Sequence, residues 1–214
     1  MIVKKITNII DVPLFLDGIS VAIFDLDDTL YSEKEYVRSG FNAVAKQISC
    51  VDNMAEKLWC VFENGGSAID EVLKSEGIYS EERKVECLKI YRLHTPEINL
   101  YEGVRDMLLG LKNNGIRLAM ITDGRAEGQR AKIKALRLHE LFDKIIITDE
   151  LGGVQYRKPN EKSFVMMQKH FSVGFNEMSY VGDNLKKDFI APQKLGMRVI
   201  FFINPDGLYT YKNG

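Results

Sequence analysis

The feature that most constrains the fold is the alternation of short apolar runs with amphipathic stretches after residue 100. The apolar runs have the length of buried strands, and the amphipathic stretches have the spacing of helices. Gly115 and Gly196 close two of these stretches at positions that suit helix ends. In chain order, the segments are 104–113, 118–121, 126–136, 145–148, 161–171, 179–181, 185–195 and 199–203. The alternation predicts right-handed βαβ units, and therefore an α/β fold in which helices flank both faces of a parallel sheet.

An earlier apolar run, residues 21–24, opens directly onto Asp25, Asp27 and Asp28. Ligands of open parallel sheets bind beyond the carboxyl ends of the strands, so we expect Asp25 and Asp27 in a site rather than in the core. Clustered carboxylates repel one another unless a cation lies between them. Mg²⁺ binds carboxylate and carbonyl oxygens and recruits substrate phosphates to complete its coordination. The cluster therefore predicts a metal-dependent phosphate chemistry.

Residues 31–100 differ from the rest, because they lack strand-like runs and their apolar side chains recur at helical spacing. They are most simply a small helical domain inserted after the strand at 21–24. The predicted division is thus a core domain of residues 1–30 and 101–214 with an inserted helical cap of residues 31–100. We expect the insertion to close over the acids and exclude water as a lid does. The alternative is a helical extension at the side of the sheet.

Charge and hydropathy exclude several classes of partner. The net charge is −1 with both signs mixed, so we expect no nucleic-acid partner and no binding to an acidic membrane surface. No apolar run approaches the length of a membrane span. Polar Thr7, Asn8 and Asp11 interrupt the N-terminal segment, so no secretion signal is predicted.

The three cysteines are Cys50, Cys60 and Cys87, an odd number without close pairing. This argues against a disulfide framework and a zinc site, and it favours a reducing, cytoplasmic location. All three lie in segment 31–100, where burial in a small helical core is their simplest role.

Polar residues also follow the predicted strands further along the chain. Thr122, Asp123 and Gly124 combine a hydroxyl with a turn whose backbone N–H groups precede a helix, which suits an anion. Lys158 lies in a loop at a helix start, where its charge suits a phosphoryl group or a carboxylate. Taken alone, the first set is a turn and helix cap, and the lysine is a solvated surface residue.

A fourth segment repeats the opening arrangement, since Asp183 follows the apolar run at 179–181 and Asp188 comes soon after. Asp188 alone is equally well an exposed helix residue. The order of all four segments, each after an expected strand, favours one shared site at the rim of the sheet.

In this order the four segments resemble the four motifs of the haloacid dehalogenase-like hydrolase superfamily, in its subgroup with a helical cap between the first and second motifs. The resemblance covers residues 19–204. It implies a three-layer α/β/α core with a Rossmann-like sheet, a mobile cap and Mg²⁺-dependent phosphoryl transfer. Members that remove halogen lack an acid two residues after the nucleophile, so Asp27 argues against that activity.

Carried over residue by residue, the resemblance makes Asp25 the nucleophile that forms an aspartyl-phosphate. It makes Asp27 the general acid and base, with a pKa raised by its surroundings. The metal set would be the Asp25 carboxylate, the backbone carbonyl of Asp27 and Asp183. Asp188 would orient Lys158 or a metal-bound water from behind these ligands.

For the phosphoryl oxygens, the resemblance assigns the Thr122 hydroxyl together with the backbone N–H groups of Asp123 and Gly124. Lys158 would neutralise charge as the phosphoryl group moves.

The resemblance thus predicts a phosphatase whose partner is a small-molecule phosphate ester. Three alternatives stay open: a phosphomutase of the same superfamily, a receiver module of a signalling relay, and a catalytically silent protein that binds a phosphorylated ligand. A receiver normally has no helical insertion and carries its acceptor aspartate mid-chain, which disfavours it.

Similar capped enzymes act on phosphoglycolate, sugar phosphates, nucleoside monophosphates and acylneuraminate phosphates. The sequence does not choose among these substrates, and it leaves open the oligomeric state and the role of residues 1–18. The candidate substrate contacts are Tyr31, Ser32, Glu33, Tyr36 and Arg125. Ordinary packing is the alternative for Tyr36, and a solvated helix start is the alternative for Arg125.

Overall fold

The computed structural model describes residues 3–208 of the chain. Its contacts divide the chain into two compact units. One contains the residues up to Glu33 and those from Asn99 onward, and the other is Lys34–Ile98. Within the described residues, no helix is both long and apolar enough to cross a membrane.

The first unit is built on a six-stranded sheet in the order β1-β6-β5-β2-β3-β4, with every neighbouring pair parallel. The strands are β1 (Lys4–Ile6), β2 (Val21–Phe24), β3 (Arg117–Thr122), β4 (Lys144–Ile147), β5 (Met178–Gly182) and β6 (Arg198–Phe202). Both neighbours of the central strand β2 are in register with it, since Val21 is level with Arg117 on one side and Met178 on the other. The predicted parallel α/β fold is confirmed.

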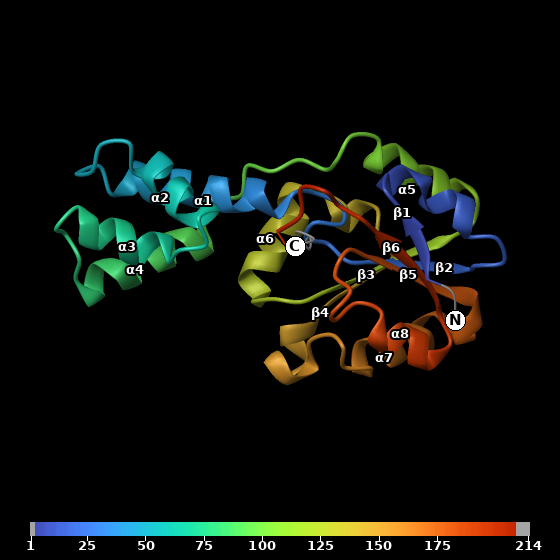
Figure 1. Cartoon of the computed structure of the whole chain (residues 1–214). Helices are drawn as coiled ribbons and strands as arrows, with labels where there is room; N and C mark the ends of the chain where they lie inside the picture. Colours follow the sequence, from blue (N-terminus) through green and yellow to red (C-terminus); the bar gives the residue numbers. More distant parts are fainter. Residues whose placement is uncertain (1–2, 209–214) are drawn as a thin grey trace. The chain divides into compact units, whose positions relative to one another are not determined.

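Helices cover both faces of this sheet. They are α5 (Val104–Asn113), α6 (Ala126–Ala135), α7 (Lys162–Phe171) and α8 (Ile190–Leu195), and in Figure 1 α5 lies above the strands while α7 and α8 lie below them. Val21 and Ile23 of β2 pack with Phe164 and Met167 of α7 in one buried cluster. All four residues of β2 are buried, which explains why this strand reads as a continuous apolar run.

One predicted helix is wrong in its first part. The helix expected over 185–195 begins only at Ile190, because residues before it form turns. The Asp188 carboxylate accepts a hydrogen bond of 2.8 Å from the backbone N–H of Asn184. A side chain that binds the local backbone in this way competes with helix formation.

The segment before residue 18, whose role the sequence left open, supplies an edge strand. Lys4–Ile6 pairs in parallel with β6, and a 3₁₀ helix, η1 (Ile9–Phe15), follows it. The run at 21–24 is therefore the second strand along the chain rather than the first. Further short 3₁₀ helices are η2 (Leu138–Glu140), η3 (Thr148–Leu151), η4 (Val154–Tyr156) and η5 (Phe175–Glu177).

The helical insertion between β2 and β3 contains α1 (Glu33–Gln47), α2 (Met54–Glu63), α3 (Ala68–Ser75) and α4 (Glu81–Leu93). These helices share their own apolar core, in which Phe41, Leu58 and Leu73 are buried. Cys87 is buried in this core, whereas Cys50 and Cys60 are exposed, and all three thiols are free. The expectation of burial is thus wrong for two of the three cysteines.

Candidate active site

Two acids end neighbouring strands of the sheet. Asp25 follows β2, and its backbone N–H donates to the carbonyl oxygen of Val181 in β5 at 2.9 Å. Asp183 follows β5, which pairs with β2 in parallel. Because parallel strands present their carboxyl ends at one edge, both side chains lie at the same rim of the sheet.

Asp188 joins Asp25 and Asp183 in a compact acidic cluster. Each of the three offers a carboxylate oxygen, and these atoms lie within 4.8 Å of one another. The hydroxyl of Thr29 donates to Oδ1 of Asp183 at 3.2 Å, which orients that carboxylate. Three carboxylates this close form a donor set that fits a hard divalent cation such as Mg²⁺.

The electrostatics of the cluster favour a cation. Burial raises the pKa of Asp25 to about 6, helped by the charge of Asp188 and opposed by Lys158. Burial and repulsion from Asp25 and Asp188 raise the pKa of Asp183 to about 8. Asp25 and Asp183 therefore retain protons to an unusually high pH, and a cation bound between them would displace these protons.

Lys158 places one positive charge against this cluster. Its Nζ atom lies 2.8 Å from Oδ2 of Asp25 and 2.8 Å from Oδ1 of Asp188. It also donates to the hydroxyl of Tyr180 at 2.7 Å. Burial alone would lower the pKa of Lys158, but Asp188 and Asp25 hold the pKa well above its ordinary value. The lysine is therefore charged. It is also buried, so the alternative of a solvated surface lysine is wrong.

The Asp27 carboxylate is held by side chains of α6. Its Oδ1 accepts from Nζ of Lys132 at 2.7 Å, and its Oδ2 accepts from Nε2 of Gln129 at 2.8 Å. The Tyr31 hydroxyl donates to the same carboxylate. Burial opposes ionisation, yet Lys132 and these hydrogen bonds lower the pKa of Asp27 below its ordinary value, so the expected rise in this pKa is wrong. The predicted metal contact through the Asp27 backbone carbonyl stays a prediction.

The segment Thr122–Gly124 connects several parts of the site. Thr122 is buried at the end of β3, and its Oγ1 accepts from Nε2 of Gln129 at 2.5 Å. The Asp123 carboxylate accepts from the Thr148 hydroxyl at 2.9 Å and from the backbone N–H of Lys158 at 3.0 Å. The Asp123 side chain thus holds the loop that carries Lys158 in place. The resemblance assigned only the backbone N–H of Asp123, to a phosphoryl oxygen.

Asp188 has two roles in the geometry. One oxygen contacts Lys158, and the other accepts from the backbone N–H of Asn184 at 2.8 Å. Its carboxylate packs so closely on Gly182 that a Cβ atom there would lie 2.5 Å from Oδ2. Only glycine leaves room for this acid beside the strand end.

The candidate substrate contacts fall into different environments. Tyr31 is fully buried and bonded to Asp27, and Arg125 is exposed. Burial and the charge of Asp27 raise the pKa of Glu33 to about 8.

Tyr36 belongs to the second unit, where its ring packs edge-on against Tyr91 at 5.9 Å between centroids. Ser32 is half-buried. The geometry thus supports packing for Tyr36.

Sequence reasoning missed four polar residues near these acids, namely Thr29, Gln129, Lys132 and Tyr180. Gln129 and Lys132 lie three residues apart in the predicted helix 126–136, so a helical projection would have placed both on one face. Thr29 follows the acidic run directly. Tyr180 gave no signal, because it reads as a residue of an apolar strand.

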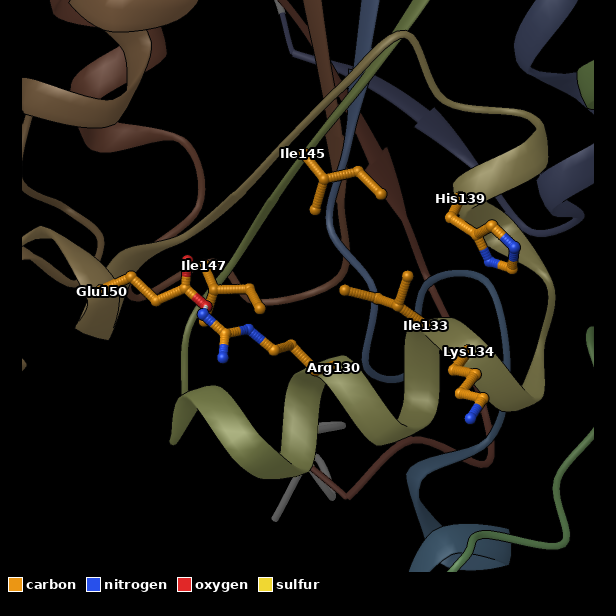
Figure 2. A pocket seen from close by; sticks show the side chains of 7 residues that line it. All are labelled: Arg130, Ile133, Lys134, His139, Ile145, Ile147 and Glu150. Atoms are coloured by element: carbon orange, nitrogen blue, oxygen red, sulfur yellow. Dashed lines mark ion pairs between the residues drawn. The ribbon is translucent and has the colours of Figure 1, made fainter.

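A separate hollow lies between α6 and the edge strand β4, with a volume of about 470 Å³ (Figure 2). Ile133, Ile145 and Ile147 form its apolar part, and Arg130 pairs with Glu150 at 2.7 Å across one end. None of the predicted site residues lines it.

Several known proteins are similar to this chain in sequence or fold. The glyceraldehyde 3-phosphate phosphatase of Methanocaldococcus jannaschii is 28% identical over 192 residues, covering 82% of this chain and 81% of the relative. The Methanopyrus kandleri protein of the same name is 31% identical and covers 84% and 82%. Among solved structures, the putative hydrolase YfnB of Bacillus subtilis bound to magnesium has a TM-score of 0.64 at 18% identity, covering 88% of each chain.

The family match extends over nearly the whole first unit and the insertion. The sequence profile described as haloacid dehalogenase-like hydrolase matches residues 22–202. This range begins inside β2, spans the helical insertion and ends with β6. The chain therefore belongs to the haloacid dehalogenase-like hydrolase family.

Proposed function

We propose that this chain is a Mg²⁺-dependent phosphatase that hydrolyses a small phosphomonoester through an aspartyl-phosphate on Asp25. The observation that carries the proposal is the buried Asp25 carboxylate, held 2.8 Å from the Lys158 ammonium within a cluster of acids. A nucleophile held in place beside a cation meets the main demands of phosphoryl transfer, which are positioning and charge stabilisation.

The reaction needs two displacements at phosphorus. In the first, an Asp25 oxygen forms a bond to phosphorus while the bond to the leaving oxygen breaks. Asp27 gives that oxygen a proton, which Asp27 must take up with the substrate because Lys132 keeps it ionised in the free protein. In the second, the oxygen of a water bonds to phosphorus and the Asp25–phosphorus bond breaks. The proton of this water passes to Asp27, which releases it as the phosphate departs and so returns to the ionised state of the free protein.

The remaining residues of the site would bind the phosphoryl oxygens and the Mg²⁺ ion. Thr122 and the backbone N–H groups of Asp123 and Gly124 would hold the phosphoryl oxygens, and Lys158 would neutralise them. The carboxylates of Asp25 and Asp183 and the carbonyl of Asp27 would hold Mg²⁺, which supplies further positive charge against the phosphoryl group. Asp188 orients Lys158 through the 2.8 Å contact.

For the substrate we propose a small sugar phosphate, with glyceraldehyde 3-phosphate as the first candidate. The support is similarity over most of the chain to two proteins named for that substrate. We also propose the cytoplasmic location that the odd number and spacing of the cysteines predict.

The test is release of inorganic phosphate from a panel of phosphomonoesters, with Mg²⁺ and with EDTA. The panel holds glyceraldehyde 3-phosphate, phosphoglycolate, sugar phosphates, nucleoside monophosphates and an acylneuraminate phosphate. Asp25→Asn removes the nucleophile, and Asp106→Asn, an exposed acid of α5, is the matched control. Release by the wild type and Asp106→Asn alone, abolished by EDTA, supports the proposal. An isomeric product without free phosphate would favour the mutase, and binding without turnover would favour a silent phospho-ligand protein.

A further inference from the structure

We propose that Gln129 and Lys132 of α6 are positioning residues that fix the Asp27 carboxylate for proton transfer to the leaving oxygen, and that Gln129 couples this carboxylate to the Thr122 hydroxyl. The inference rests on the proposed phosphatase function. It concerns two side chains that neither the motifs nor the comparisons assign to the site.

The geometry places both side chains on one face of α6. Their positions differ by three residues, which puts them side by side on a helix. Gln129 is 3% exposed and Lys132 is 4% exposed. Lys132 donates to Oδ1 of Asp27 at 2.7 Å, and Gln129 donates to Oδ2 at 2.8 Å. Each oxygen of the carboxylate is therefore held by a different residue of the same rigid element.

The packing of α6 does not by itself require that the polar side chains of Gln129 and Lys132 be buried. A buried ammonium is costly unless it is paired, and an apolar residue of similar volume often serves stability as well or better. Ile133, the neighbouring buried residue of α6, shows what ordinary packing of this helix requires. The pair Lys132 and Gln129 instead faces a carboxylate to which the mechanism gives a proton-transfer role.

Gln129 adds a second connection. Its Nε2 atom has two hydrogens, and it donates to Thr122 Oγ1 at 2.5 Å as well as to Asp27. Because Thr122 Oγ1 accepts this bond, the hydroxyl hydrogen of Thr122 remains available for an acceptor such as a phosphoryl oxygen. The Gln129 amide thereby orients both the Asp27 carboxylate, which transfers the proton, and the Thr122 hydroxyl, which would bind a phosphoryl oxygen.

A role in orienting Asp27 has a signature that a structural role lacks. Leaving groups that depart as stable anions need no proton, whereas an alkyl oxygen does. Loss of Asp27 orientation should therefore slow hydrolysis of an alkyl phosphate and spare p-nitrophenyl phosphate. The ratio kcat/KM is the right quantity, because it reports the steps up to departure of the leaving group and not the later attack of water.

The experiment compares kcat/KM for both substrates in Lys132→Met, Gln129→Leu and Asp27→Asn. Lys134→Met, an exposed lysine of the same helix, is the matched control. General acid catalysis contributes roughly 100-fold or more, so we expect losses of roughly tenfold to 100-fold with the alkyl phosphate and under about threefold with p-nitrophenyl phosphate. Lys132→Arg should recover part of the loss, and Lys132→Met should add nothing to Asp27→Asn.

Melting temperature and Mg²⁺ affinity of each variant, compared with the wild type, identify failures of folding. Equal losses with the two substrates in a folded variant would overturn the inference alone. The inference would also be overturned if the loss in the double variant were the product of the losses in Asp27→Asn and Lys132→Met. A wild type that hydrolyses neither substrate would overturn the proposed function, and this inference with it.

Discussion

Lys158 Nζ lies 2.8 Å from Oδ2 of Asp25, with 0% and 3% of the two side chains exposed. Such a pair is stable in a protein interior only when further polar groups satisfy both ions. Here Asp188 and Tyr180 complete the environment of the ammonium. The lysine therefore holds Asp25 in one orientation before any substrate binds, which would reduce the reorganisation needed for the proposed attack of Asp25 on phosphorus.

Replacing Lys158 with Met should abolish phosphatase activity and reduce stability. The change leaves Asp25 and Asp188 buried without their shared cation, and breaking a buried pair in this way costs about 3 kcal/mol. Urea unfolding in EDTA measures the free energy of unfolding. Lys169→Met, at an exposed position of α7, should leave both stability and activity unchanged. A stable, active Lys158→Met protein would contradict the assigned role.

Gly182→Ala should weaken Mg²⁺ binding. A Cβ atom would lie 2.5 Å from Oδ2 and 2.9 Å from Cγ of Asp188, so the acid must move. We expect the Kd for Mg²⁺, measured by calorimetry, to rise roughly tenfold, equivalent to about 1.4 kcal/mol. Gly110→Ala is the control, because nothing lies within 4 Å of its added Cβ. That variant should gain about 0.5–1 kcal/mol of stability as a helix residue. Unchanged Mg²⁺ affinity in Gly182→Ala would contradict the close packing.

The central sheet was predictable because buried parallel strands are continuous apolar runs, as in β2. The edge strand β1 was not, since Lys4 and Lys5 are exposed and only Ile6 is buried. Its strand character depends on pairing with β6, nearly 200 residues further along the chain. The late start of α8 likewise depends on a hydrogen bond of the Asp188 side chain.

The strand-end acids were predictable for a similar reason, because strand ends in a parallel sheet share one rim. The partners of Asp27 were not. Gln129 and Lys132 lie 102 and 105 residues from it in the sequence. Both are polar residues of an amphipathic helix, and such residues are ordinarily expected on its solvent-exposed face. Only the tertiary fold, which brings α6 beside the residue that follows β2 by two positions, joins them. Asp188 was placed behind the ligands, whereas its carboxylate lies within the acidic cluster.

Mg²⁺ affinity should rise with pH. The pKa of Asp183 is raised from 3.8 to about 8, so between these values the folded protein binds a proton that the unfolded chain does not. Unfolding free energy of the metal-free protein should therefore fall as pH rises from about 4 to 8. Mg²⁺ competes with this proton and should restore stability most at alkaline pH.

Melting curves at several pH values, with Mg²⁺ and with EDTA, measure both effects. Calorimetry in buffers of different ionisation enthalpy counts the protons released on binding. Asp183→Asn should reduce the pH slope and leave the contributions of Glu33 and Asp25, whose pKa values are also raised, and the exposed Asp106→Asn should keep the full slope. An Mg²⁺ affinity independent of pH would contradict the raised pKa of Asp183.

Tyr180→Phe should separate the hydroxyl from the ring. The ring packs edge-on against Phe164 at 5.2 Å between centroids and is retained, while Lys158 loses its 2.7 Å bond to the hydroxyl. A lost hydrogen bond to a charged group costs about 1.5 kcal/mol, and a less well oriented Lys158 should lower kcat roughly tenfold. Tyr156→Phe, at a half-buried position, should change neither quantity. If Tyr180→Phe matches the wild type in urea unfolding and in turnover, the hydroxyl does not help to hold Lys158 against Asp25.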